Sequence, residues 1–346
     1  MKKKNIINLF NYVKMIFHIR NIKHELKNMA NQAETIKTQA ETIKNLKRTN
    51  EIMNKVWHKF VSDEKNKSTA IEAFKSLTCN SADTLLIQSY LKYLLKNFDE
   101  ICRRNGIKYW FRGGSLLGVV RHGGFIPWDD DIDLGITRND MYKLQEILED
   151  TDFKIVYYFN DNLPENICRM PRFINAKNGI DIFIDLFPFD FTEEYEKDAV
   201  KTYWSKRRQL YDEIHPLVEN NIIANYKGFM FEDNSKDLNL LNEIFDKYTI
   251  KDQVVSANMI YPFDWFDTTQ NLYYKISDIF PLREMKFEDM DVYVPNDFIL
   301  ALNMCYDNFL DFPPQFVDHK DCHKLLANKR HIKKFLLREK TRANLH

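Results

Sequence analysis

Apolar residues recur every three or four positions along the first 60 residues, which is the spacing of one helix face. From Ile19 to Ile43 the steps alternate between three and four, and residues 32–38 are repeated almost unchanged as residues 39–45. Such a repeat is typical of a coiled coil, because it keeps one apolar seam facing a partner helix. A single helix docked on its own domain is the alternative. We expect an N-terminal amphipathic or coiled-coil helix over residues 1–61 and self-association through it.

The first 17 residues carry a second pattern. Three lysines, Lys2 to Lys4, precede an apolar helical face that runs from Ile6 to Phe17. Basic residues beside an apolar face suit a helix that lies on an anionic membrane surface. The first turns of a packed helix are the alternative, and the pattern alone does not separate the two.

Beyond residue 81 the pattern changes to helices mixed with short strands, which indicates an α+β fold. Polar residues 62–69 predict a linker over 62–81, followed by a catalytic domain over 82–330 and a basic C-terminal tail over 331–346. Asn178-Gly179 is typical of a hairpin turn, and Pro188 is expected to close the strand that returns from it. We expect helices over 82–104, 137–150 and 193–213, and strands over 107–112, 131–136, 153–159, 167–176 and 179–187.

Composition narrows the class of protein. The 346 residues carry 50 basic and 50 acidic side chains, so a general nucleic-acid binder is disfavoured, since such proteins carry a basic excess. The five cysteines are scattered and form no CxxC pair, which predicts neither a disulfide framework nor a zinc ribbon. A reducing cytoplasm is the natural compartment for such a chain.

Four aspartates crowd into five positions at Asp129, Asp130, Asp131 and Asp133. On a strand, Asp129, Asp131 and Asp133 share one face and Asp130 lies on the other. Two such charges about 4 Å apart repel by about 4 kcal/mol at an effective dielectric near 20. A cation between them removes this cost, and carboxylate oxygens suit Mg²⁺ or Mn²⁺. A solvated acidic loop is the alternative, although apolar residues flank the run on both sides.

A glycine-rich turn precedes this run. Gly113, Gly114 and Ser115 follow a predicted strand, and the backbone of such a turn can approach phosphate oxygens. A Gly-Ser turn followed by an Asp-x-Asp strand is typical of the DNA polymerase beta-like nucleotidyltransferase fold. More specifically, residues 114–122 (GSLLGVVRH) and 124–134 (GFIPWDDDIDL) resemble the core motif of the LicD family.

The resemblance covers roughly residues 84–330 and leaves the N-terminal helix outside it. Ile184 to Asp190 resembles a further strand motif of the family, whereas Cys305-Tyr306-Asp307 departs from its usual Tyr-Gly. The family implies a small mixed sheet flanked by helices. It also implies Mg²⁺-dependent transfer of a phospho-alcohol, such as phosphocholine, from a CDP-linked donor to a glycan of the lipopolysaccharide, capsule or teichoic acid type.

Carried over by position, Asp131, Asp133 and Asp185 are the implied metal-binding and catalytic acids. From the residues alone Asp181 competes with Asp185, because both lie on the Phe-lined face of the same predicted strand. Asp190, which follows Pro188, is expected to be a helix N-cap or turn residue rather than a ligand.

The expected donor-phosphate residues are Gly113, Gly114, Ser115, Arg121 and His122. For Arg121 a surface ion pair with the acidic run is the alternative. Two further arginines, Arg169 and Arg172, are weaker candidates for phosphate ligands, and we expect them to be ion-paired instead.

The alternative function is a nucleotide-sugar-dependent glycosyltransferase, which would also use Asp-x-Asp to hold a metal. The Gly113–Ser115 turn favours the phospho-alcohol transferase, because glycosyltransferase Asp-x-Asp motifs normally lack it. We expect a cytoplasmic homo-oligomer that is peripheral on the inner face of the membrane. Its expected partners are a CDP-alcohol donor and a glycan acceptor, either free or lipid-linked. Choline, ethanolamine, glycerol and ribitol all fit as the alcohol.

Overall fold

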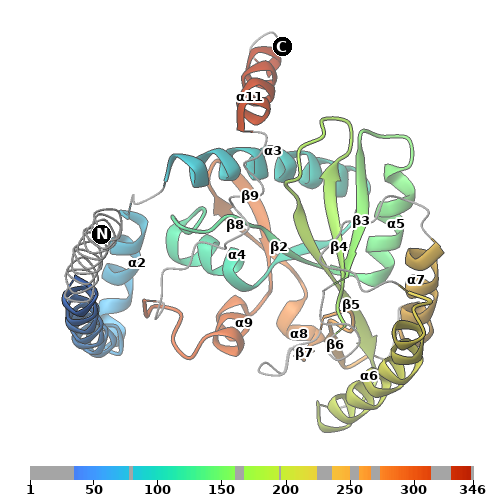
Figure 1. Ribbon diagram of the computed structural model, residues 1–346, viewed down its shortest axis with the longest axis horizontal. Helices are drawn as coiled ribbons and strands as arrows, with labels where there is room; N and C mark the ends of the chain where they lie inside the picture. The colour runs from blue at the N-terminus through green and yellow to red at the C-terminus, as the bar shows by residue number, and fades with distance from the viewer. Residues whose placement is uncertain are drawn as a thin grey trace, which may run out of the picture. The chain divides into compact units, whose positions relative to one another are not determined.

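The computed structural model of the chain describes residues 35–77, 81–159, 167–194, 196–223, 236–249, 257–265, 273–312 and 329–343. It divides into two units, Met1–Asn66 and Lys67–His346 (Figure 1). In the first unit residues 35–61 form one helix, followed by the short helix η1 (Glu64–Asn66). The helix agrees with the apolar periodicity, while its pairing as a coiled coil stays a prediction. The lysines and the apolar face of residues 2–17 lie outside the described residues.

The second unit is built on a mixed seven-stranded sheet with the order β1-β2-β5-β4-β3, to which β6 and β7 add beyond β5. Strands β2 and β5 are parallel, and the other neighbouring pairs are antiparallel. A separate hairpin is formed by β8 and β9. The strands are β1 (Tyr109–Phe111), β2 (Asp133–Thr137), β3 (Phe153–Phe159), β4 (Arg169–Asn175), β5 (Ile184–Thr192), β6 (Met259–Tyr261), β7 (Tyr274–Lys275), β8 (Arg283–Phe287) and β9 (Met290–Val294).

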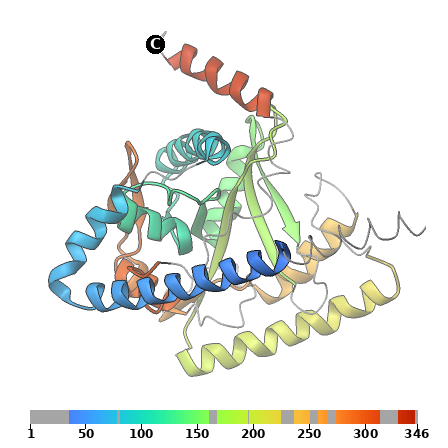
Figure 2. The same cartoon turned by 60° about the vertical axis from the view of Figure 1, so that its left-hand side comes forward.

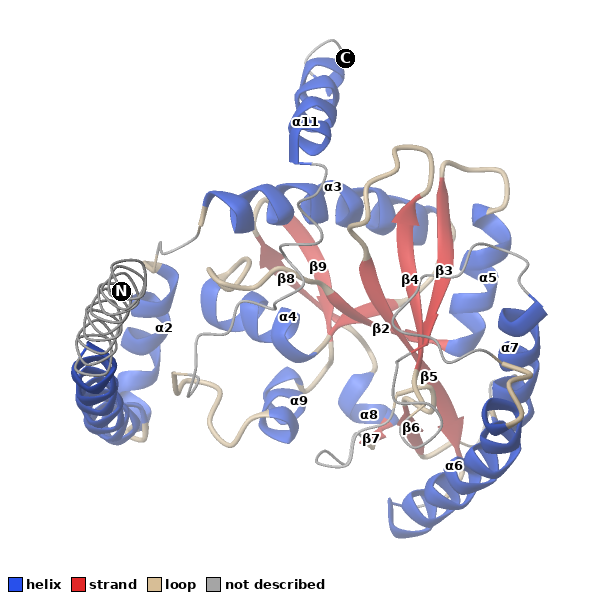
Figure 3. Ribbon diagram, viewed as in Figure 1, coloured by secondary structure: helices blue, strands red, loops and turns tan. Residues whose placement is uncertain are grey.

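Helices flank this sheet (Figure 3), which confirms the mixed α and β class. Helix α3 (Ala82–Arg104) packs against β4 and β5 and is seen nearly end-on in Figure 2. Helix α5 (Arg138–Leu148) packs against β2, β3 and β5, and Thr137 caps it by accepting the Asp140 backbone N–H at 3.2 Å. The other helices are α4 (Gly113–Leu117), η2 (Gly118–His122), α6 (Glu196–Glu219), α7 (Lys236–Tyr248), α8 (Ile276–Ile279) and α9 (Phe298–Cys305).

Both segments that flank the predicted catalytic domain differ from expectation. The predicted linker contains α2 (Lys67–Lys75), because its Phe74 is buried against the rings of His122 and Phe312. The predicted basic tail is α11 (Lys329–Ala343), which packs against α3. Its Ile332 is fully buried, so the segment has an apolar anchor as well as its charges.

Strand β5 also differs from its predicted bounds. It begins at Ile184 and continues through Pro188 to Thr192, instead of spanning residues 179–187. Pro188 lies opposite Ile136 of β2, and β4 pairs with β5 only beside Asp185 and Ile184. At Pro188 the strand is therefore paired on one side, which is where a sheet tolerates proline.

Within the described part of the chain, no helix is both long enough and apolar enough to cross a membrane.

Candidate active site

Two carboxylates lie side by side where the parallel strands β2 and β5 begin. Asp133, the first residue of β2, is directly opposite Asp185 of β5. The Asp185 backbone N–H donates to the carbonyl of Ile132 at 2.9 Å, which fixes the register at this end. Because side chains alternate along a strand, Asp133 and Asp185 belong to the same face of the sheet. Residues 52 positions apart in sequence thereby present two acids together.

The acidic run only partly follows the prediction that it lies on a strand between buried apolar residues. Ile132 and Leu134 are fully buried, whereas Asp131 and Asp133 are half-buried. Asp130 is buried, with 6% of its surface exposed. The strand itself begins only at Asp133, so Asp131 lies just before it rather than on it.

The glycine turn lies against these carboxylates. A Cβ atom added at Gly113 would come within 3.3 Å of an Asp133 carboxylate oxygen, and one at Gly114 within 3.3 Å of an Asp129 oxygen. Gly113 also has a φ of +53°, which L side chains rarely adopt. Ser115 ties the turn to β2, because its hydroxyl accepts the Asp133 backbone N–H at 2.8 Å. The turn and the acidic strand are thus one packed assembly.

Asp185 is held by a neighbouring arginine. Arg172 of β4 donates from Nε to Asp185 Oδ1 at 2.8 Å, and its guanidinium stacks on the rings of Phe183 and Tyr158. Burial raises the pKa of Asp185, and the charge of Arg172 opposes that rise. Asp181, the competing acid, is exposed and precedes the strand. The structure therefore places Asp185 and not Asp181 beside Asp133.

The carboxylates of the site suit a divalent cation that binds together with a phosphate of the substrate. Among the described residues no three carboxylate, imidazole or thiolate groups converge in a geometry that would hold a metal ion. Mg²⁺, however, is usually held by one or two carboxylates together with phosphate oxygens of the substrate. Asp133 and Asp185 supply oxygen ligands of that kind, and Arg172 occupies only one oxygen of Asp185. The donor set fits an ion that binds together with a phosphate, and Asp131 as a third ligand stays a prediction.

Two predicted phosphate contacts are placed differently. Arg121 is buried, donates from Nη1 to the carbonyls of Phe309 and Asp311, and stacks on Phe74. It is therefore not a surface residue. Burial lowers its pKa to about 10, and the charges of Tyr306 and Asp129 act in the opposite direction. The pKa of His122 is lowered to about 3, first by burial and then by the charge of Arg121. At neutral pH its ring is uncharged and does not supply the cation that the sequence led us to expect.

Two residues near the site were not among the predicted site residues, although one of them, Tyr306, lies in the stretch that departs from the family's Tyr-Gly. Tyr306 follows α9, and its hydroxyl lies 4.0 Å from the position of a Cβ added at Gly114. Burial raises the pKa of Tyr306, and the charges of Asp129 and Asp133 act in the same direction. The second residue is Arg112, whose guanidinium lies 3.8 Å from the centre of the Phe187 ring. A single Tyr or Arg in such a chain has no local pattern that would distinguish it.

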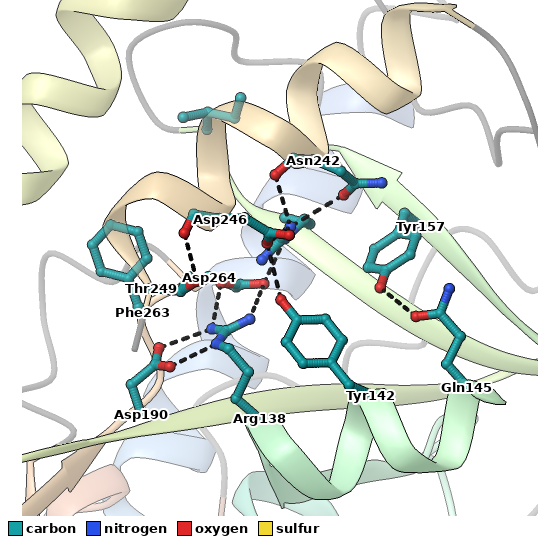
Figure 4. Close-up of polar contacts among 12 residues, drawn as sticks. Arg138, Tyr142, Gln145, Tyr157, Asp190, Asn242, Asp246, Thr249, Phe263 and Asp264 are labelled. Atoms are coloured by element: carbon teal, nitrogen blue, oxygen red, sulfur yellow. Dashed lines mark hydrogen bonds and ion pairs between the residues drawn. The ribbon is translucent and has the colours of Figure 1, made fainter. Parts of the chain in front are cut away.

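A buried network of charges lies further along β5 (Figure 4). Arg138 of α5 pairs with Asp190 at 2.6 Å and with Asp264 at 2.7 Å, and Asp264 also pairs with Arg169 of β4 at 2.7 Å. Arg169 continues the network to Asp246 of α7 at 2.8 Å. Asp190 is therefore a buried strand residue in an ion pair, and the prediction of an N-cap or turn role is wrong. The expectation that Arg169 and Arg172 are ion-paired is confirmed.

Comparison with known proteins agrees with this site. Residues 106–224 match the domain described as "LicD/FKTN/FKRP, nucleotidyltransferase domain". This part of the chain therefore matches the LicD family domain, as the motif around Asp131 and Asp133 predicted.

Individual relatives share parts of the chain. An uncharacterized protein of Rickettsia prowazekii is 31% identical over 173 residues, which are 45% of this chain and 58% of the relative. The mouse ribitol 5-phosphate transferase FKRP is 52% identical over 131 residues (36% and 25%). The Haemophilus influenzae lipopolysaccharide cholinephosphotransferase LicD is 43% identical over 54 residues (16% and 20%). The chain spans about half the length of the two Rickettsia relatives it matches, at 58% and 43%.

Proposed function

We propose that the protein transfers a phospho-alcohol from a CDP-linked donor to a glycan in a Mg²⁺-dependent reaction. The observation that carries the proposal is the meeting of Asp133, Asp185 and the Gly113–Ser115 turn at one end of the sheet. The relatives' names support the same chemistry, since one is a ribitol 5-phosphate transferase and another a cholinephosphotransferase.

The reaction forms one bond between the acceptor oxygen and the phosphorus that carries the alcohol. The bond from that phosphorus to the bridging oxygen breaks, and CMP leaves with the electron pair. Asp185 either shares the metal ion with Asp131 and Asp133 or accepts the proton of the acceptor hydroxyl, in both cases on the carboxylate oxygen that Arg172 does not occupy. A buried carboxylate whose pKa is raised suits the second role, because it binds the proton more readily than an exposed one.

Phosphoryl transfer depends mainly on positioning and on neutralising the charge that develops on the leaving group. Mg²⁺, when bound, would supply that neutralisation at the donor diphosphate. Asp131 and Asp133 are the proposed residues that hold it. The Gly113–Ser115 turn would set the distance between the donor phosphates and these carboxylates, because no side chain intervenes at Gly113 or Gly114.

The alcohol and the acceptor form the finer part of the proposal. Choline and ribitol are the alcohols that the relatives' names carry, and ethanolamine and glycerol are chemically close to them. A cytoplasmic site beside the inner membrane face suits a lipid-linked glycan acceptor, and self-association through the N-terminal helix would present several sites to it.

The test offers the purified full chain a panel of CDP-alcohols with Mg²⁺ and candidate glycans, and follows CMP release. Nucleotide sugars in the same panel test the glycosyltransferase alternative. We expect Asp185→Asn to lower turnover at least 100-fold, whereas its control Asp181→Asn, at an exposed position, should stay near the wild type. Release of CMP from none of the donors, or equal turnover in the two variants, would contradict the proposal.

The strand face gives a second matched pair of variants. Asp133→Asn should abolish turnover while the Tm changes by only a few degrees, because relief of carboxylate repulsion offsets the lost contacts. Asp130→Asn, at a buried position before β2 begins, should cost far less activity. Loss of activity in Asp130→Asn alone would show that the assignment of these acids is wrong.

A further inference from the structure

Three arginines lie around the candidate site, and two of them are already committed. Arg172 pairs with Asp185, and Arg121 donates to two backbone carbonyls. Arg112 differs, because its half-buried guanidinium has no hydrogen-bond or ion-pair partner in the described part of the chain. Its guanidinium carbon lies 3.8 Å from the centre of the Phe187 ring, over the face of that ring.

The backbone places this side chain at the site. Arg112 immediately precedes Gly113, and its backbone N–H donates to the Asp133 carbonyl at 3.2 Å. Phe187 follows Asp185 by two residues in β5, so both side chains point to the same face of the sheet. The guanidinium therefore lies on the face that carries Asp133 and Asp185.

Although these carboxylates share its face, the guanidinium forms no ion pair with any of the described residues. Stacking on an aromatic ring compensates partly for the water that a half-buried guanidinium loses, but it leaves the N–H donors unused. Those donors form a rigid planar fork that matches two phosphate oxygens at once. The ring of Phe187 also fixes the plane of the fork, so little freedom is lost when an anion binds.

We propose that Arg112 is a phosphate-binding residue that grips the diphosphate of the nucleotide donor. The identity of the ligand rests on the proposed function, whereas the anion-binding role rests on the geometry. In the transfer step Arg112 would hold a non-bridging oxygen of the departing CMP and neutralise part of its charge.

The test measures binding to the full-length protein by isothermal titration calorimetry, with CDP, inorganic pyrophosphate and cytidine as probes, each with and without Mg²⁺. Arg112→Gln should weaken CDP and pyrophosphate at least tenfold and leave cytidine unchanged. Arg112→Lys keeps the charge but loses the planar fork, so it should weaken both several-fold. The control is Arg104→Gln, an exposed arginine paired with Glu100 on α3, and it should bind like the wild type.

The outcomes separate this inference from the proposed function. If the wild type transfers no alcohol but Arg112→Gln loses pyrophosphate binding, the proposed function fails and the anion site stands. If transfer occurs but Arg112→Gln binds CDP within twofold of the wild type, the anion site is wrong. Failure of the wild type to bind CDP or pyrophosphate at millimolar concentration also overturns it. Should Arg112→Gln not fold, Arg112→Lys decides, and wild-type affinity in that variant overturns the proposal.

Discussion

Replacing Asp264 by Asn gives a stringent test of the buried charge network. Its carboxylate faces Arg138 and Arg169, and all three side chains are only 1% exposed. The Asn side chain keeps the shape but places an amide N–H₂ where a carboxylate oxygen accepted, so two buried cations lose a shared counter-charge. Breaking a buried pair in this way typically costs about 3–5 kcal/mol. For a folded unit of this size that corresponds to a Tm lower by about 10 °C.

The pH dependence of this loss has a definite sign. Burial acts to raise the pKa of Asp264, but the charges of Arg138 and Arg169 outweigh it and hold the pKa below the ordinary value of 3.8. A depressed pKa contributes stability that is fully present above the unfolded-state value and is lost as the pH falls through the folded-state value. The difference between wild type and Asp264→Asn should therefore be constant near neutral pH and shrink below about pH 4.

Urea unfolding followed by tryptophan fluorescence, at pH 7 and at stepwise lower pH, measures both effects. Asp198→Asn is the control, because its ion pair with Lys201 is exposed on both sides and should contribute almost nothing. A free energy of unfolding for Asp264→Asn within 1 kcal/mol of the wild type at pH 7 would refute the argument, being well below the expected ~3–5 kcal/mol. So would a difference that stays unchanged in acid.

Three further outcomes follow from the packing. Gly135→Ala should destabilise the protein by about 3 kcal/mol, because the added Cβ would lie 2.4 Å from the Trp110 indole; an unchanged Tm would contradict this. Ser115→Ala should cost about 1–3 kcal/mol in chemical unfolding, since it leaves the Asp133 backbone N–H without its acceptor. Light scattering of the full chain at micromolar concentration should give a mass of at least twice the 41.5 kDa of one chain. Ile43→Asp should lower that mass, and a monomeric wild type would contradict self-association through the apolar seam of the N-terminal helix.

The elements that sequence could predict are those whose cause is local. Helix α3 (Ala82–Arg104) matches its predicted span, because its apolar stripe is continuous and Ser81 caps its start. Strand β3 (Phe153–Phe159) also matches. The acidic run before and within β2 could be located for the same reason, since the motif that carries Asp131 and Asp133 is contiguous.

The features that sequence missed depend on distant partners. Arg138 meets Asp264 across 126 residues, and Arg121 donates to a carbonyl 188 residues away. The sequence neighbours of these two arginines do not distinguish them from surface arginines. The sequence therefore predicts neither the buried network nor the structural role of Arg121. The run of β5 through Pro188 was missed because it depends on which edge of the strand is paired.

The ion pairs of strand β5 and its neighbours determine how short a fragment of this protein can be and still keep its buried arginines paired. The segment that matches the family domain, residues 106–224, contains Arg121, Arg138 and Arg169. It lacks the groups that accept most of the hydrogen bonds from these three guanidiniums. Asp264 and the carbonyl of Phe309 come from later in the chain, and helix α3, which covers the sheet, comes from before. The matched segment is thus smaller than the compact unit Lys67–His346 that contains it. A relative that keeps these arginines is expected to supply a carboxylate and a carbonyl from whatever chain follows, however little that chain resembles this one.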